Sequence, residues 1–154
     1  MIVPVDPRSA DEVGEFMREV VLHSVDATDA EKQAYLANIR TNLAAWQQRP
    51  ETALHLQYLR DDGLAGVVMV KAWWNLCHLF VGIDSQRRGI GRALVEAAVV
   101  HCSERSARDR LQLNAARNAA PFYEHLGFVR VADAPASAAG IAYELLLHPL
   151  RPLR

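Results

Sequence analysis

The stretch that decides the fold is Leu79-Phe-Val-Gly-Ile-Asp-Ser-Gln-Arg-Arg-Gly-Ile-Gly-Arg-Ala-Leu94. An apolar strand end leads into a polar loop with two glycines, and a helical pattern of apolar residues starts after the second one. Because glycine has no Cβ, main-chain N–H groups in such a loop can approach a phosphate closely, and the start of the helix adds further donors. Arg87, Arg88 and Arg92 bring positive charge to the same place. This combination predicts a binding site for a pyrophosphate.

Three other interpretations of the loop compete with this prediction. The dinucleotide-binding fingerprint needs a third glycine where this chain has Leu94, and a P-loop needs Lys followed by Ser or Thr where it has Arg92 and Ala93. The third interpretation is a glycine-loosened turn with solvated arginines and no ligand. The first two do not match the sequence, and the third stays open on the loop alone.

Two helices are predicted before this stretch. The pairs Ser9/Glu12 and Thr28/Glu31 have the spacing of a capping box, in which each side chain bonds the main-chain N–H of the other residue. Pro50 is expected to end the second helix, because its ring is incompatible with a continuing helix. Apolar residues at helical spacing follow each pair, namely Val13, Phe16, Met17 and Val20 in the first helix and Leu36, Ile39, Leu43 and Trp46 in the second.

Strands are expected on both sides of the loop. Alternating apolar residues predict strands at 53–60, 64–74 and 76–81, with a tight turn at 61–63. After the helix that starts at Gly91, the pattern predicts a strand at 111–115, then a short helix at 119–126 that Asn118 caps and Gly127 stops. Two final strands at 128–132 and 141–148 are joined by the small-residue loop 133–140. With a strand at the start of the chain, this order predicts a mixed α/β sheet with one βαβ crossover.

The composition is that of one globular domain over residues 1–154. Hydrophobic residues make up 51% and charged residues 23% of the chain, a balance that favours a packed core over disorder. The net charge of -1 gives no basic excess for nucleic acid or an anionic membrane, so neither partner is expected. Two cysteines, a start without the features of a signal peptide and no apolar run long enough to span a membrane predict a cytoplasmic protein. A homodimer is left open.

Two blocks of the sequence resemble the GNAT superfamily of N-acetyltransferases. Gln86-Arg-Arg-Gly-Ile-Gly91 is similar to the Q/R-x-x-G-x-G/A signature of that family, and it follows a hydrophobic-aromatic-Val strand end, as the family's signature does. The second block is Asn114-Ala-Ala-Arg-Asn-Ala-Ala-Pro-Phe-Tyr-Glu-His-Leu-Gly-Phe128, which looks like the family's later strand and short helix. The resemblance is good from about residue 64 to 128. Gly82-Ile-Asp84 departs from the common pattern, which often has a proline there.

The resemblance implies a GNAT-like fold whose sheet is splayed between its fourth and fifth strands, at 76–81 and 111–115. It implies that acetyl-CoA binds in that gap, with main-chain groups of Leu79 and Val81 on the pantetheine amides and the N–H groups of residues 88–93 around the pyrophosphate. Asn118 would contact the pantetheine arm, and Asn114 is either a residue that faces the gap or a strand-end turn residue. The cofactor-binding residues so implied are Leu79, Phe80, Val81, Gln86, Arg87, Arg88, Gly89, Ile90, Gly91, Arg92, Ala93, Asn114, Asn118 and Tyr123.

The activity implied is transfer of an acetyl group from acetyl-CoA to a primary amine of a small molecule or peptide, by direct attack. Tyr123 is the expected general acid, because a phenol beside the sulfur stays protonated at neutral pH and can donate as the thiolate leaves. Cys77 and Cys102 have no base visible in the sequence that would make either one a nucleophile. The alternatives are a longer acyl donor and a non-catalytic module that senses acyl-CoA.

The resemblance implies a general base, in many members a carboxylate, on the strand before the phosphate loop. Residues 75–81 contain no Asp or Glu, so His78 is the expected substitute, because an ordinary histidine titrates near neutrality. Strand alternation puts His78 on the face opposite Cys77 and Leu79. Deprotonation by solvent, or before binding, is the alternative. The six histidines are scattered without metal-ligand spacing, so no metal is expected.

Two pairs of residues near the expected acceptor side have two interpretations each. Trp73 and Trp74 could stack on a substrate, and packing in the core or at its rim is the alternative. Asp26 and Asp29 could attract a cationic amine or form a solvated helix cap.

Overall fold

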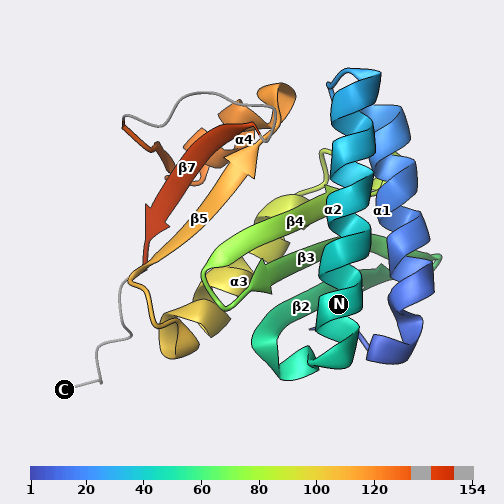
Figure 1. The fold of residues 1–154 in the computed structure, drawn as a ribbon, viewed down its shortest axis with the longest axis horizontal. Coiled ribbons are helices and arrows are strands. Elements are labelled where there is room, and N and C mark those ends of the chain that lie inside the picture. Colours follow the sequence, from blue (N-terminus) through green and yellow to red (C-terminus); the bar gives the residue numbers. More distant parts are fainter. Residues whose placement is uncertain (133–139, 148–154) are drawn as a thin grey trace.

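A computed structural model of the chain describes residues 1–132 and 140–147. Its helices are α1 (Ala10–Ser24), α2 (Asp29–Gln48), α3 (Ile90–Arg105) and α4 (Ala120–His125), with 3-10 turns at Pro7–Ser9, Pro50–Thr52, Ile83–Ser85 and Arg117–Ala119. Its strands are β1 (Ile2–Pro4), β2 (Ala53–Arg60), β3 (Gly63–Lys71), β4 (Asn75–Val81), β5 (Arg110–Ala115), β6 (Val129–Arg130) and β7 (Ile141–Leu146). The predicted order of helices and strands is confirmed (Figure 1). His148, the end of the last predicted strand, and residues 133–139 of the predicted loop lie outside the described residues.

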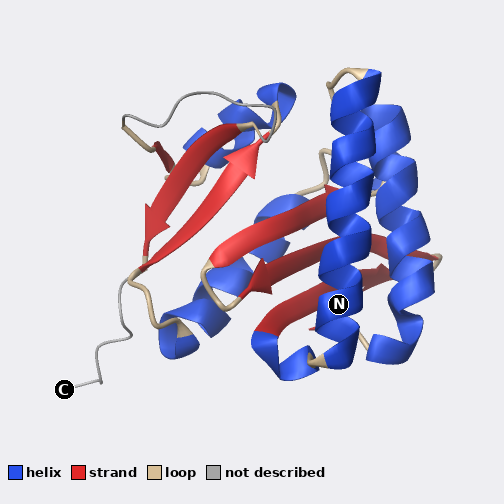
Figure 2. Cartoon of the chain, in the orientation of Figure 1, coloured by secondary structure: helices blue, strands red, loops and turns tan. Residues whose placement is uncertain are grey.

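The seven strands form one mixed sheet in the order β1-β2-β3-β4-β5-β7-β6. All neighbouring strands are antiparallel except β4 and β5, which are parallel. These two strands share a single register pair, Asn75 with Gln112, whereas β5 pairs with β7 over six residues. Beyond Asn75 and Gln112 the two strands diverge, as Figure 2 shows. The predicted splay between the fourth and fifth strands is therefore confirmed.

Helices cover both faces of the sheet. Helices α1 and α2 lie over one face of β2–β4, and α3 lies behind the other face (Figure 1). The apolar stripe predicted for α2 is buried: Leu36, Ile39, Leu43 and Trp46 are at most 8% exposed and belong to the core cluster on the α1–α2 face. Leu94, Ala98 and Cys102 of α3 belong to the cluster on the opposite face. None of the helices within the described residues is long and apolar enough to span a membrane.

A β-bulge interrupts the alternation of side chains along β4. Met69 of β3 pairs with His78, and the next residue, Val70, pairs with Leu76, so Cys77 is an extra residue without a partner. Cys77 packs against the cluster under α1 and α2, and His78 hydrogen-bonds to α2, so both face the same side. Leu79 packs on the α3 side. The alternation predicted around His78 is therefore right for Leu79 and wrong for Cys77.

Two of the three predicted N-terminal helix caps, those at Ser9 and Asn118, are wrong. At Thr28 the capping box is present, with hydrogen bonds of 3.1 and 3.0 Å to and from Glu31. Ser9 makes no side-chain cap, because it ends a 3-10 turn with ψ 13° and lacks the extended backbone that a capping side chain needs. Asn118 does not cap α4 either, because it lies inside the 3-10 turn before that helix and its amide bonds to Ser24.

The strand predicted at 64–74 ends earlier, at Lys71. Ala72 and Trp73 have φ values of 54° and 66° and form a hairpin turn between β3 and β4. Two consecutive residues with positive φ are typical of the tight turns whose twist matches that of the flanking strands. The predicted strand was too long because apolar residues continue through Ala72 and Trp73, and neither is a glycine or asparagine that would have marked a turn.

Candidate active site

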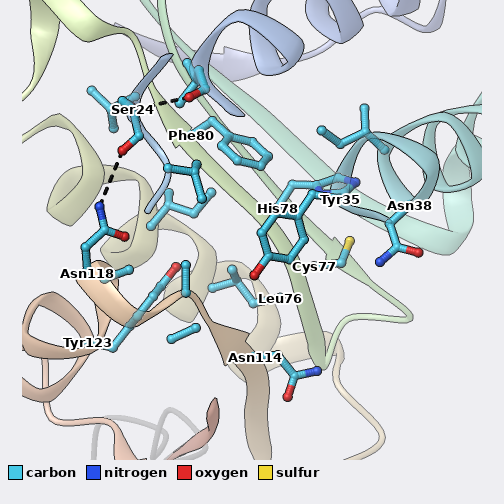
Figure 3. A pocket seen from close by; sticks show the side chains of 18 of the residues that line it. Ser24, Tyr35, Asn38, Leu76, Cys77, His78, Phe80, Asn114, Asn118 and Tyr123 are labelled. Carbon is cyan, nitrogen blue, oxygen red and sulfur yellow. Dashed lines mark hydrogen bonds between the residues drawn. The ribbon is translucent and has the colours of Figure 1, made fainter. Parts of the chain in front are cut away.

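A cavity of about 260 Å³ lies where β4 and β5 diverge. Its walls come from β4, from the end of β5 and the segment that leads to α4, and from the helices α1 and α2 (Figure 3). The residues from the two strands include Leu76, Cys77, His78, Leu79, Phe80, Val81, Asn114 and Ala115, and those from the two helices include Val20, Ser24, Tyr35, Asn38 and Ile39.

The main chain of β4 has hydrogen-bonding groups on the side of the cavity. The N–H of Gly82 donates to Ala65 of β3 over 2.8 Å, so it points toward β3. Because main-chain groups of successive strand residues point to opposite sides, those of Val81 and Leu79 point toward the diverging β5. These are the two residues predicted to pair with an extended ligand, and they face the gap.

The start of α3 leaves main-chain N–H groups without a partner in the helix. Gly89 has φ 78° and no side chain caps the helix. The first helical hydrogen bond runs from Ala93 to Gly89, so the N–H groups of the residues between them have no partner within the helix. Arg87 and Arg88 are exposed beside this helix end. Free N–H groups, the positive end of the helix dipole and two guanidinium groups together suit a phosphate.

The other signature residues of this loop have structural contacts. The side-chain amide of Gln86 donates to the carbonyl of Val81 and to the hydroxyl of Ser24, each over 3.2 Å, and so ties the loop to β4 and α1. Arg92 pairs with Glu96 one turn along the helix, at 2.8 Å. Gly91 is buried, and a Cβ there would lie 3.3 Å from the Phe122 ring of α4. Gly91 therefore permits close helix packing, in addition to any contact with a ligand.

Tyr123 is 7% exposed and lines the cavity from α4. Its ring makes edge-to-face contacts with Phe122 and Phe128, with centroids 5.1 and 5.5 Å away, which fix its orientation. Its hydroxyl points into the cavity, as does that of Tyr35 from α2 (Figure 3). Burial raises the pKa of Tyr123 above its ordinary value, so the hydroxyl carries its proton at physiological pH.

His78 is 3% exposed and lines the same cavity, but its chemistry differs from the prediction. Burial lowers the pKa of its imidazole to about 4. Its Nε2 lies 3.2 Å from the side-chain amide nitrogen of Asn42. The expectation of a near-neutral pKa was therefore wrong, because it assumed a solvated ring.

Neither cysteine has the character of a nucleophile. Burial raises the pKa of the Cys77 thiol to about 11 and that of Cys102 to about 12. Cys77 lines the cavity, whereas Cys102 lies in the core under α3. Both thiols stay protonated at neutral pH, and a protonated thiol reacts poorly with a thioester.

Of the remaining residues predicted to have a role in the site, some line the cavity and others lie outside it. Asn114 and Asn118 line the cavity, and the Asn118 amide donates to the carbonyl of Ser24 over 3.4 Å. Asp26 and Asp29 are exposed and are not among the lining residues, and Asp26 lies 4.0 Å from Arg117. These two acidic residues therefore fit the solvated cap better than an acceptor site.

Trp73 and Trp74 are also away from the cavity, in the turn between β3 and β4. The guanidinium of Arg105 lies 3.9 Å from the Trp73 ring centroid, and that of Arg108 lies 3.6 Å from the Trp74 ring centroid. Trp73 and Trp74 therefore pack against arginine side chains and do not line the cavity.

Sequence reasoning missed the contribution of α2. Tyr35 and Asn38 line the cavity, and Asn42 contacts His78. Asn42 lies three residues after Ile39 and four before Trp46, so it falls on the apolar stripe that packs on the sheet. A polar residue on a buried stripe was the signal that could have found it.

The family model of the acetyltransferase (GNAT) domain matches residues 24–144. The chain belongs to the GNAT acetyltransferase family. None of the curated protein sequences matches this acetyltransferase-family chain.

Solved structures of GNAT proteins have the same fold. A GCN5-related N-acetyltransferase from Rhodopseudomonas palustris has 21% identity and a TM-score of 0.77, over 96% of this chain and 95% of that one. The PaiA N-acetyltransferase from Thermoplasma acidophilum, in complex with coenzyme A, has 16% identity and a TM-score of 0.74, over 95% and 98%. The YncA acetyltransferase from Salmonella typhimurium, with acetyl-CoA, has 18% identity and a TM-score of 0.71, over 96% and 94%.

Proposed function

We propose that this GNAT-family chain is an N-acetyltransferase that moves an acetyl group from acetyl-CoA to a primary amine by direct attack. The observation that carries the proposal is a cavity between two diverging strands, lined by a buried tyrosine and by Gln86 of the loop that leads to an uncapped helix start. Two structures of similar fold hold coenzyme A or acetyl-CoA, which supports the same ligand here.

The residues present fit acetyl-CoA along its length. The N–H groups at the start of α3, with Arg87 and Arg88, would bind the pyrophosphate. The main-chain groups of Leu79 and the N–H of Val81, whose carbonyl accepts from Gln86, would pair with the two amides of the pantetheine arm, as a neighbouring strand would. Asn114 and Asn118 would lie along the other side of the arm.

The reaction then needs a proton donor beside the sulfur. Acetyl-CoA supplies the acetyl group as an activated thioester. As the amine nitrogen forms its bond to the carbonyl carbon, the carbon–sulfur bond breaks and the sulfur gains negative charge. The Tyr123 hydroxyl would donate its proton to that sulfur, the amine nitrogen would lose a proton to solvent, and the tyrosinate would regain a proton from solvent before the next turnover.

We propose that water, or the amine's own equilibrium, removes the amine proton, and that His78 does not. A base with a pKa of about 4 is weak at neutral pH, and the Nε2 lone pair already accepts a hydrogen bond from Asn42. The raised thiol pKa of Cys77 supports direct attack over a covalent acyl-enzyme.

The acceptor would enter from the α1–α2 side, where Tyr35 and Asn38 line the cavity. We propose a small-molecule or peptide amine as the acceptor. The free thiols of Cys77 and Cys102 support a reducing compartment, for which we propose the cytoplasm.

Two measurements test the proposed function. The melting temperature should rise with CoA concentration, because CoA binds the folded state only. Release of free CoA from acetyl-CoA should then depend on a primary amine drawn from a panel of peptides and small molecules. No thermal shift at millimolar CoA would remove the proposal, and CoA binding without turnover of any amine would favour the sensing module.

A further inference from the structure

The two halves of the sheet are joined at one point, the apex of the gap between β4 and β5. The N–H of Gln112 on β5 donates to the carbonyl of Trp74 over 2.8 Å, next to the single register pair of Asn75 and Gln112. The direction in which β4 and β5 leave this apex sets the width of the cavity farther along.

Arg108, in the loop between α3 and β5, touches both sides of the apex. Its guanidinium lies 3.6 Å from the ring centroid of Trp74, which precedes β4. Its Nη1 donates to the side-chain oxygen of Gln112, on β5, over 3.4 Å. Its main-chain N–H is held by the hydroxyl of Ser106 over 3.1 Å. A planar guanidinium can stack and donate at the same time, which an ammonium group cannot do.

The turn that presents Trp74 is strained. Ala72 and Trp73 both have positive φ, a backbone conformation that residues with a Cβ disfavour. Backbone strain of this kind persists only where surrounding contacts fix it, and it clusters at functional sites. Here the contacts are hydrogen bonds from the Ala72 N–H to Thr52 over 2.9 Å and from Trp73 Nε1 to Glu51 over 3.4 Å. The stacks of Arg105 on Trp73 and of Arg108 on Trp74 add to them.

We propose that Arg108 is a positioning residue that sets the divergence of β4 and β5 and thereby the affinity for acetyl-CoA. The inference rests on the proposed function. Leu79 lies four residues beyond Asn75, about 13 Å along an extended strand. A rotation of β4 by about 5° at the apex would move Leu79 by about 1 Å, enough to take a hydrogen bond to a bound ligand out of range.

The chain offers a matched control in Arg105, which stacks on the neighbouring tryptophan and, among the described residues, forms no hydrogen bond or ion pair with β5. In Arg108→Ala the dissociation constant for CoA and the KM for acetyl-CoA should rise at least fivefold, while the KM for the amine changes less than twofold. In Arg105→Ala both CoA parameters should stay within twofold of the wild type. Arg108→Lys keeps the charge but not the planar stack, so it should behave as Arg108→Ala does. Calorimetric titration with CoA, steady-state kinetics and thermal melting of each variant give these values.

Each outcome decides the proposal. Equal CoA affinity in the Arg108→Ala and Arg105→Ala variants would overturn it, as would a loss of affinity that Arg108→Lys restores. If Arg108→Ala does not fold, the comparison of Arg108→Lys with Arg105→Lys decides in the same way. Failure of the wild-type chain to bind CoA would instead contradict the proposed function itself, and the role of Arg108 with it.

Discussion

The side-chain amide of Asn42, on α2, donates a hydrogen bond to Nε2 of His78, on β4, over 3.2 Å. The direction of this bond is fixed by a third residue. Lys71 donates from Nζ to the amide oxygen of Asn42 over 3.1 Å, and since an ammonium group can only donate, the amide nitrogen of Asn42 must face His78. Nε2 is therefore the acceptor, and the neutral ring carries its proton on Nδ1. This chain of hydrogen bonds favours the uncharged imidazole.

The pH dependence of the reaction should therefore not report His78. In His78→Gln, which keeps an acceptor for Asn42, the acidic limb of the kcat/KM profile should stay where the wild-type limb is, because that limb belongs to the amine. A limb from His78 itself would lie near pH 4. Profiles of both proteins between pH 5 and 9 with one amine give the answer. Loss of the limb in the folded variant would restore His78 as the base.

Stability should fall on the acid side of neutrality because of two buried histidines. Burial lowers the pKa of His55 to about 3 and that of His78 to about 4, against 6.5 for an exposed ring. Below pH 6.5 the unfolded chain binds protons that the folded chain does not, so the free energy of unfolding decreases as pH falls toward the folded pKa values. The slope is at most about 1.4 kcal/mol per pH unit for each histidine.

His55 provides the test of this acid sensitivity. Neither of its ring nitrogens has a hydrogen-bond partner among the described residues, and the ring packs on Trp46 with centroids 4.4 Å apart. His55→Phe keeps a ring in that place, so urea denaturation at pH 7 and pH 5 should show a smaller loss of stability than in the wild type. His101→Gln, at an exposed position on α3, should leave the difference unchanged. An equal loss of stability between pH 7 and pH 5 in the wild type and both variants would contradict the assignment of the acid sensitivity to His55.

Removing the Tyr123 hydroxyl should slow the reaction without weakening cofactor binding. In Tyr123→Phe the edge-to-face contacts with Phe122 and Phe128 are kept, and only the proton donor is lost. We expect kcat to fall roughly 10²-fold or more, with little change in the KM for acetyl-CoA.

Tyr35→Phe is the matched control, since its hydroxyl also points into the cavity (Figure 3). Its kcat should change far less than that of Tyr123→Phe in steady-state assays with the same amine. A near wild-type kcat in Tyr123→Phe would reassign Tyr123 to packing. Comparable losses in both variants would mean that the cavity needs both hydroxyls for a different reason.

Substitution of Gly91 should affect both the ligand and the fold. From the loop alone, Gly91→Val is expected to lower CoA affinity with the fold retained, because a branched side chain stands where the main chain would approach a phosphate. A Cβ at this position would approach the Phe122 ring to 3.3 Å, so the branched side chain must displace α4 to some extent. We now expect a lower melting temperature in addition to an affinity for CoA at least tenfold weaker, about 1.4 kcal/mol.

The two effects are separated by titrating CoA at a temperature at which circular dichroism shows the variant to be folded. A folded Gly91→Val protein with wild-type CoA affinity would mean that Gly91 serves helix packing alone.

Local sequence patterns determined the positions of most helices and strands of this protein. The helix after the glycine loop, the buried stripe of α2 and the cap at Thr28 follow from spacing, since each depends on residues within one or two turns of the chain. The resemblance of residues 86–91 and 114–128 to the GNAT family predicted the two splayed parallel strands.

The tertiary structure decided the chemistry of the cavity. The bulge at Cys77 depends on the register of β4 against β3, which alternation along one strand does not contain. Burial in the folded chain lowers the pKa of His78, and its ring meets Asn42, 36 residues away in the sequence. Ala72 and Trp73 adopt positive φ in the turn between β3 and β4, although neither residue type favours it. Arginines from α3 and the following loop stack on the tryptophans of this turn. Local spacing predicts elements, whereas burial, proton affinity and strain are set by residues that meet only in the folded chain.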